Sequence, residues 1–338
     1  MEEFLRKSEY FYNHRTDMKP LLDGFLYESE SLFFYGASGS GKSLFAYAFA
    51  VAIAGESGEF LSIPCATNKK VLYIDGEMHY NTICDRFESL GESNNLDYLS
   101  STDMVSNKVN PINLNEEVNF EELVDIVIKN QHDLVVIDNV RTLFQLTDEG
   151  SSESWQRVND LIFRLRAAGA SVIMIHHTTK EAYKIDGELI WSGSSNAITV
   201  VDRTCGIDKI ADQSFSLVTG IKEGRSGDGW NMALNDMAFK VTDKGLSTFD
   251  YHLDIVEQLN SYHYWLLNQL DMKSRDKLKV FNHRFGLGLG KKLTIEPVWE
   301  ASKHMWQMVE DDFDLSAFRH LLKTGELPSQ NPDNKPLF

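Results

Sequence analysis

The segment "FFYGASGSGKSLFAYAFAVAIAG" constrains the fold of this chain more than any other stretch. It fits the pattern G-x-x-x-x-G-K-[ST], in which the backbone N–H groups of a glycine-rich loop cradle phosphates. An apolar strand-like stretch precedes the loop and an apolar helical stretch follows it, which is the order that this mechanism requires. A glycine-serine turn that merely precedes a lysine would not need these flanks. We therefore predict a phosphate-binding loop, formed by Gly36, Ala37, Ser38, Gly39, Ser40, Gly41, Lys42 and Ser43.

A phosphate-binding loop predicts a carboxylate at the end of a second buried strand, which holds Mg²⁺ through water. In "HDLVVIDNVRTLF" the residues 134–137 are continuously apolar, and Asp138 ends the run. Lys42 is expected to reach the β- and γ-phosphates, and the Ser43 hydroxyl is expected to bind Mg²⁺. The two segments together predict a nucleotide site that contains Mg²⁺.

Two acidic residues follow another predicted strand, "VLYI" at 71–74. A polar loop start is the simple interpretation of Asp75 and Glu77. Beside a nucleotide, however, a carboxylate at this edge of the sheet can orient and polarise the attacking water. Glu77 is therefore the candidate general base, whereas Asp75 is expected to bind the loop backbone or to remain solvated.

A further strand, "ASVIMIHHTTK", ends in His176 and His177. Adjacent residues in a strand point to opposite faces, so the pair is a poor metal site, and one imidazole is expected to face the nucleotide. The three cysteines lie far apart without C-x-x-C spacing, which indicates a reduced, cytoplasmic protein without a zinc site. The N-terminal residues show no signal peptide, and the apolar stretch Ser43–Gly55 is shorter than the roughly 20 residues of a membrane span.

The order of these elements predicts an α/β fold with a mainly parallel twisted sheet, whose ligands bind at the carboxyl ends of the strands. Between residues 199 and 250 the pattern changes to short strands separated by turns, which indicates an antiparallel extension of the sheet. We predict one domain over residues 1–250, including an N-terminal arm, and a small helical module with a mobile tail over residues 251–338.

The net charge of −17 excludes a basic field over the whole chain that would attract nucleic acid. One segment, 273–292, is locally basic and contains only Asp276 as an acid. A solvated helix face and a surface for DNA or for an acidic partner are both open interpretations of this segment. Its cations are Lys273, Arg275, Lys277, Lys279, Arg284, Lys291 and Lys292.

The combination of "GASGSGKS", "VLYIDGEM" with "DRFESLG", "LVVIDNVRTLF", "VIMIHHTTK" and "WSGSSNAITVVDR" resembles the RecA-type ATPases of the plasmid RepA helicase group. These proteins belong with the superfamily 4 ring helicases, and the resemblance covers roughly residues 15–250. It implies a RecA-like P-loop core, ATP bound between neighbours in a six-membered ring, and movement along single-stranded DNA.

Carried over by position, the resemblance implies that Lys42 and Ser43 hold phosphate and Mg²⁺ and that Glu77 activates water. Asp138 becomes the Walker B acid, and His177 becomes the γ-phosphate sensor with His176 beside it.

Further basic residues are implied at the boundary between subunits. Arg86 matches a boundary arginine, and Arg203 stands at the position of the trans-acting arginine finger. Lys222 and Arg225 differ from the K-x-R pair of many ring helicases by one residue of spacing, so a hairpin turn with exposed charges is an equal alternative. The expected pore loops carry acids as well as bases. Two functions therefore remain open: a helicase or translocase, and a nucleotide-gated loader, regulator or assembly factor that does not unwind DNA.

Overall fold

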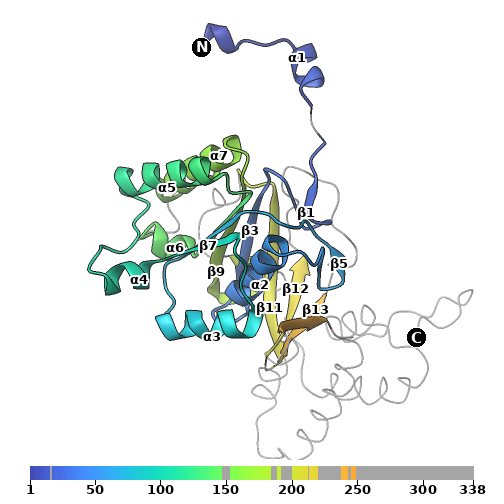
Figure 1. Ribbon diagram of the computed structural model, residues 1–338, viewed down its shortest axis with the longest axis vertical. Coiled ribbons are helices and arrows are strands. Elements are labelled where there is room, and N and C mark those ends of the chain that lie inside the picture. The colour runs from blue at the N-terminus through green and yellow to red at the C-terminus, as the bar shows by residue number, and fades with distance from the viewer. Residues whose placement is uncertain are drawn as a thin grey trace, which may run out of the picture.

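A computed structural model describes residues 1–15, 17–146, 153–183, 189–191, 200–211, 213–219, 237–242 and 245–248. Its centre is one ten-stranded sheet in the order β14-β13-β12-β11-β3-β9-β8-β6-β7, with β10 paired to β9 (Figure 1). The strands are β3 (Ser31–Gly36), β6 (Val71–Asp75), β7 (Leu96–Ser100), β8 (Leu134–Asp138), β9 (Ser171–Tyr183), β10 (Leu189–Trp191), β11 (Arg203–Ala211), β12 (Ser214–Thr219), β13 (Ala238–Thr242) and β14 (Gly245–Thr248).

The run of strands from β11 to β7 is parallel, and β12, β13 and β14 add an antiparallel extension. The predicted α/β fold with a mainly parallel sheet is thus confirmed. β3 lies in the middle, between β11 and β9, so the loop that follows it opens near the centre of the carboxyl edge. This is the edge at which parallel α/β sheets bind ligands.

Alternation of side chains along the strands divides the core into two layers. Leu32 and Phe34 of β3 pack under α2 (Lys42–Ala54), whereas Phe33 and Tyr35 face the opposite side. That opposite side is covered by α5 (Glu117–Asn130), α6 (Val140–Leu143) and α7 (Gln156–Ala167). α3 (Tyr80–Leu90) packs on the α2 side through Phe87 and Leu90.

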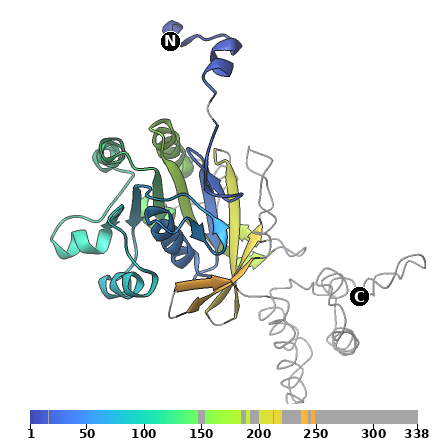
Figure 2. The same cartoon turned by 45° about the vertical axis from the view of Figure 1, so that its right-hand side comes forward.

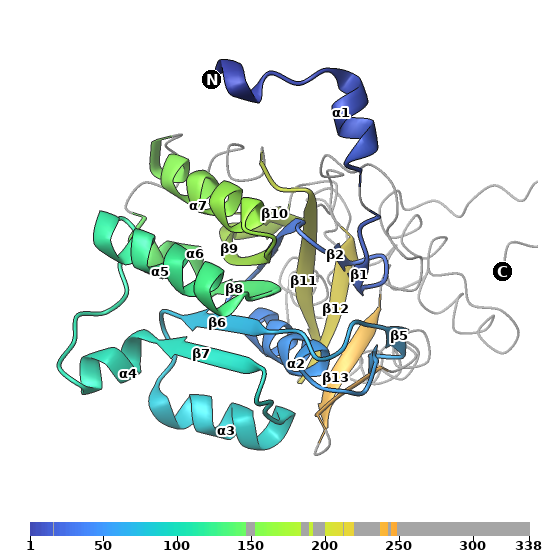
Figure 3. The same ribbon diagram turned by 45° about the horizontal axis from the view of Figure 1, so that its top comes forward.

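The two long helices α5 and α7 lie side by side (Figure 3), where ion pairs of Arg157 with Glu117 and of Arg164 with Glu121 join them. The remaining elements are short: η1 (Glu2–Phe4), α1 (Ser8–Asn13), β1 (Pro20–Leu22), β2 (Leu26–Tyr27), β4 (Glu59–Phe60), β5 (Ile63–Pro64), α4 (Ser101–Ser106) and η2 (Glu153–Trp155).

The first residues form an arm that projects away from the sheet (Figure 2), with α1 wholly exposed. The chain joins the body at β1 and β2, where Leu22, Phe25 and Leu26 are buried against the core under α2. The short helix α4 follows β7 directly. Ser100 starts this helix by accepting a hydrogen bond from the Asp103 backbone N–H, which is a local cap rather than an apolar pattern.

Several predictions concern residues outside the described part of the chain. These are the helical module and tail at 251–338, with their basic segment, and the pair Lys222 and Arg225. Among the helices that are described, none combines the length and the apolar character that crossing a membrane requires.

Candidate nucleotide-binding site

The predicted phosphate-binding loop connects the carboxyl end of β3 to the first turn of α2. A Cβ atom at Gly36 would overlap the Ile207 carbonyl oxygen of β11, so the loop can leave the sheet here only through glycine. At Gly41 the backbone is left-handed, with φ at +85°, and a Cβ would lie 2.7 Å from the Phe215 ring. Both positions therefore need glycine for steric reasons. The Ser40 hydroxyl oxygen is buried and has no hydrogen-bond partner among the described residues, which leaves a polar atom available inside the loop.

Lys42 occupies the inside of this loop. Its ammonium group donates to the carbonyl oxygens of Gly36, at 2.9 Å, and Ala37, at 2.7 Å. Burial lowers the pKa of Lys42 to about 8, although the charges of Asp138 and Glu77 oppose that shift. A buried cation with two acidic neighbours is suited to bind phosphate, whose negative charge would favour the protonated form.

Asp138 ends β8 next to this lysine and is buried. Burial raises the pKa of its carboxyl, while hydrogen bonds from Tyr73 and Ser43 and the charge of Arg86 act in the opposite direction. The Tyr73 hydroxyl donates to Asp138 Oδ2 at 2.6 Å. The hydrogen bond from Ser43 also shows that the Ser43 hydroxyl and the Asp138 carboxylate, the two groups expected to hold Mg²⁺, are adjacent.

These two oxygen ligands fit a magnesium ion that completes its shell with phosphates and water. No group of three His, Cys, Asp or Glu side chains that could hold a metal occurs within the described residues. Ser43 with Asp138 would hold the ion jointly with the nucleotide.

Asp75 and Glu77 have different surroundings. Asp75 is buried, and its Oδ1 accepts the backbone N–H groups of Glu77, at 2.8 Å, and Met78, at 3.0 Å. Its Oδ2 accepts the Tyr98 hydroxyl at 2.8 Å. Asp75 thus fixes the turn that carries Glu77.

The carboxylate of Glu77 extends from this turn toward α6, where Thr142 Oγ1 donates to it at 2.6 Å. Burial raises the pKa of Glu77, but hydrogen bonds from Thr142 and Asn139 and the charges of His177 and Lys42 lower it further than burial raises it. The net effect is a lowered pKa, so Glu77 is ionised at neutral pH, as a base that polarises water must be.

The two adjacent histidines separate to opposite faces of β9. His177 pairs with Gly36 in the strand register, and its Nε2 lies 3.3 Å from the Asn139 side-chain nitrogen. His176 is fully buried, with its ring centroid 5.6 Å from that of Phe33 and 5.2 Å from that of Trp155. The structure therefore places His177 beside the loop and does not bring His176 to it.

Arg86 lies on α3, where its charge lowers the pKa of Asp138. Its Nη1 is buried without a hydrogen-bond partner in the part of the chain that the structure describes. The Arg86 side chain therefore lies close enough to Asp138 to affect its pKa, while its Nη1 is left without a hydrogen bond among the described residues.

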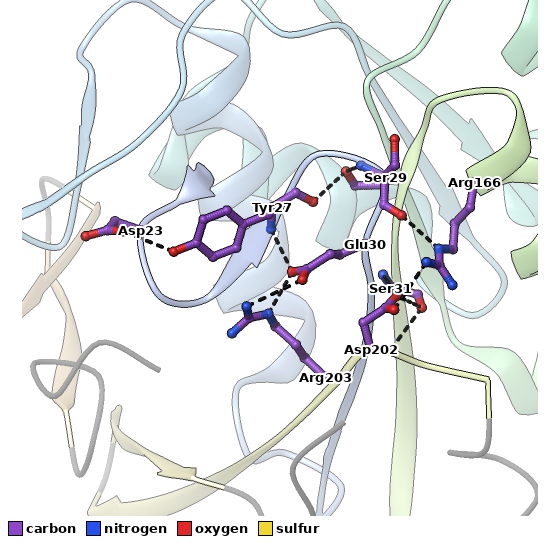
Figure 4. Close-up of polar contacts among 9 residues, drawn as sticks. Asp23, Tyr27, Ser29, Glu30, Ser31, Arg166, Asp202 and Arg203 are labelled. Atoms are coloured by element: carbon purple, nitrogen blue, oxygen red, sulfur yellow. Dashed lines mark hydrogen bonds and ion pairs between the residues drawn. The ribbon is translucent and has the colours of Figure 1, made fainter. Parts of the chain in front are cut away.

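Arg203 is the first residue of β11 and contacts Glu30 (Figure 4). It pairs with Leu32 in the strand register, so four residues of β3, or roughly 13 Å at 3.3 Å per residue, separate it from the level of Gly36. Arg203 is 4% exposed, and its Nε donates to Glu30 Oε2 at 2.6 Å. Its guanidinium carbon also lies 5.0 Å from the centre of the Tyr27 ring.

Further contacts in Figure 4 hold the backbone at Ser29 and Ser31, where β3 begins. Asp202 accepts the backbone N–H and the hydroxyl of Ser31, both at 2.8 Å, and pairs with Arg166 at 3.2 Å. Arg166 in turn donates to the Ser29 carbonyl oxygen at 2.7 Å. Arg203 is therefore part of an ionic cluster at the amino end of β3, opposite the nucleotide edge.

Sequence reasoning missed Asn139, Thr142 and Tyr73. Asn139 follows the Walker B position and caps α6, because its side chain accepts the Thr142 backbone N–H. An asparagine directly after an apolar strand is a recognisable helix-start signal. The contact of Thr142 with Glu77 has no such local signal, since 65 residues separate the two in sequence.

Comparison with known proteins agrees with this geometry. Residues 9–183, more than half of the chain, match the family described as AAA domain. The chain is also 26% identical over 185 residues to the DNA repair protein RadA of Aquifex aeolicus (strain VF5). That alignment covers 54% of this chain and 36% of RadA, so the chain spans about a third of the length of this relative. We conclude that the chain belongs to the AAA domain family and has a RecA-like P-loop core.

Proposed function

We propose that the protein is a ring-forming motor of the RepA helicase type, which hydrolyses ATP with Mg²⁺ to move along single-stranded DNA. The observation that carries the proposal is the convergence of Lys42, Glu77, Asp138 and His177 at one edge of the sheet. These residues come from four separate segments, each of which begins or ends at a central strand. The similarity to a protein named for DNA repair supports a role on DNA.

The chemistry follows from the positions of these side chains. Lys42 and the loop N–H groups would bind the β- and γ-phosphates, and Ser43 and Asp138 would hold Mg²⁺. When bound, Mg²⁺ neutralises charge that develops on the transferred phosphoryl group. Glu77, ionised and fixed in orientation, would polarise the attacking water. His177 would contact the γ-phosphate from the neighbouring strand.

A neighbouring subunit would complete the site. Transferred phosphoryl groups are commonly stabilised by an arginine, which in many ATPases comes from a partner. The ion pair with Glu30 favours a structural role for Arg203, whereas the partly buried Arg86 is adjacent to the acidic residues. Arg203, Lys222 and Arg225 remain sequence-based predictions as groups that act on a neighbour.

One experiment tests the motor directly. ATP hydrolysis is measured with and without single-stranded DNA, together with the particle mass with and without ATP and the unwinding of a forked duplex. We expect DNA to stimulate hydrolysis, ATP to stabilise a ring of several subunits, and the fork to be opened.

The net charge of −17 favours one alternative, in which the protein is a nucleotide-gated loader, regulator or assembly factor. Hydrolysis that ignores DNA, with a fork that stays intact, would replace the motor proposal with this alternative.

A further inference from the structure

One buried side chain links three groups of the nucleotide site. Asn139 is 2% exposed, and its Oδ1 accepts the backbone N–H of Thr142 at 3.1 Å. That contact fixes which end of the amide is oxygen, so the nitrogen end must face the remaining neighbours. Those neighbours are His177, whose Nε2 lies 3.3 Å from the Asn139 nitrogen, and the Glu77 carboxylate. An amide nitrogen carries two N–H groups, so one can face the His177 ring while the other donates to the Glu77 carboxylate.

A second group from the same segment holds the carboxylate. Thr142 Oγ1 donates to Glu77 Oε1 at 2.6 Å, and Thr142 lies in the turn of α6 that Asn139 caps. The backbone of Glu77 is held separately, by Asp75. The main chain of Glu77 is thus anchored from β6, whereas its carboxylate is aligned from the segment that follows the Walker B acid.

We propose that Asn139 and Thr142 are positioning residues that hold the Glu77 carboxylate in the orientation from which it polarises the attacking water. The proposal deepens the proposed function and rests on it, because it assumes that Glu77 is the base. A displacement of about 1 Å in a reacting group can reduce a rate by roughly a hundredfold, so two hydrogen bonds that define this orientation are sufficient to matter. Asn139 also joins this orientation to His177, the group expected to contact the γ-phosphate.

The central test compares Thr142→Val with Thr142→Ser. Valine keeps the branched shape but removes the donor to Glu77, whereas serine restores the donor. We expect Thr142→Val to lower kcat by roughly ten- to a hundredfold with little change in the Kd of a fluorescent ATP analogue, and Thr142→Ser to recover most of the loss. Thr82→Val is the matched control, because Thr82 is exposed on α3, and it should keep the parental kcat.

A double substitution shows whether Thr142 acts through Glu77. In a Glu77→Gln background, Thr142→Val should cause no further loss, since there is no carboxylate left to orient. An equal further loss in that background, an unchanged kcat of Thr142→Val, or an increased kcat would each overturn the positioning role. If the parental protein itself fails to hydrolyse ATP, the proposed function falls, and the positioning role falls with it.

A second position keeps the test valid if Thr142→Val does not fold, which its unfolding midpoint would reveal. Asn139→Asp keeps an oxygen that can cap α6, but it replaces the two N–H donors that face Glu77 and His177 with a second carboxylate oxygen. We expect a fall in kcat at least as large as that of Thr142→Val in a protein whose unfolding curve shows that it is folded at the assay temperature. A stable Asn139→Asp protein with the parental kcat would overturn the proposal.

Discussion

At the scale of single residues, the two carboxylates at the carboxyl end of β6, Asp75 and Glu77, have separate tasks. Glu77→Gln should bind ATP but hydrolyse it at least about a hundredfold more slowly, which is the usual effect of losing a general base. Asp75→Asn should do less, because an amide oxygen can still accept the backbone N–H groups of Glu77 and Met78. Steady-state hydrolysis and titration with a fluorescent nucleotide check both variants. Near-normal turnover of Glu77→Gln would remove it from the role of base.

The sequence predicts such residues well where the signal is local. Successive side chains in a strand point to opposite faces, which predicts that His176 and His177 have different surroundings. The structure places His176 against Phe33 and Trp155. The surroundings of Arg203 depend on Glu30, which lies 173 residues away in sequence, and no local pattern reveals such a contact. The match to a motif position identifies Arg203 as an arginine, but it does not predict that the side chain is buried against Glu30.

At the scale of elements, β3 is anchored at its amino end by the ionic cluster and carries the phosphate loop at its carboxyl end. Arg203→Ala would leave Glu30 buried without its cation, so the free energy of unfolding should fall by about 3–5 kcal/mol. Replacing both partners, with Glu30→Met and Arg203→Met, should cost less, because no buried charge is left unpaired. Urea denaturation measures both effects.

If Arg203 were instead an arginine finger that acts on a neighbouring subunit, its substitution would affect hydrolysis and not stability. In that case Arg203→Ala would lose hydrolysis while its denaturation curve stayed unchanged. Mixing it with Lys42→Ala protein would then restore activity at interfaces where both intact groups meet.

The elements themselves were largely predictable from sequence. Apolar runs bounded by polar residues identify β6 and β8, and helical spacing identifies α5 and α7. The helix α4 is harder to predict, because it has only six residues, of which one is buried, so no apolar period marks it in the sequence. Sheet order also lies beyond local patterns, since β11 pairs with β3 in parallel although five of the ten strands lie between them in the chain.

At the scale of the whole molecule, the distribution of charge decides where a polyanion can bind. The chain carries 50 acidic and 33 basic residues, so long-range attraction to DNA is absent and binding must be local. The exposed side of α5 shows the same bias, with Glu117, Glu122 and Asp125 on its surface. The segment 273–292 lies outside the described residues, but it is the dense cationic stretch of the sequence. We therefore predict that it binds the phosphates of single-stranded DNA.

Reversing Lys273, Arg275, Lys277 and Lys279 to glutamate tests this prediction. If these side chains bind phosphates, affinity for single-stranded DNA should fall, and the slope of log affinity against log salt should flatten by roughly 0.7 for each phosphate that is no longer neutralised. Hydrolysis without DNA should persist, because the residues of the nucleotide site lie between Gly36 and His177. A control that reverses four exposed lysines elsewhere changes the net charge equally and should keep the original slope; its positions are Lys7, Lys19, Lys108 and Lys129. Equal slopes in the two variants would show that the segment binds no phosphate and would favour binding to a protein partner instead.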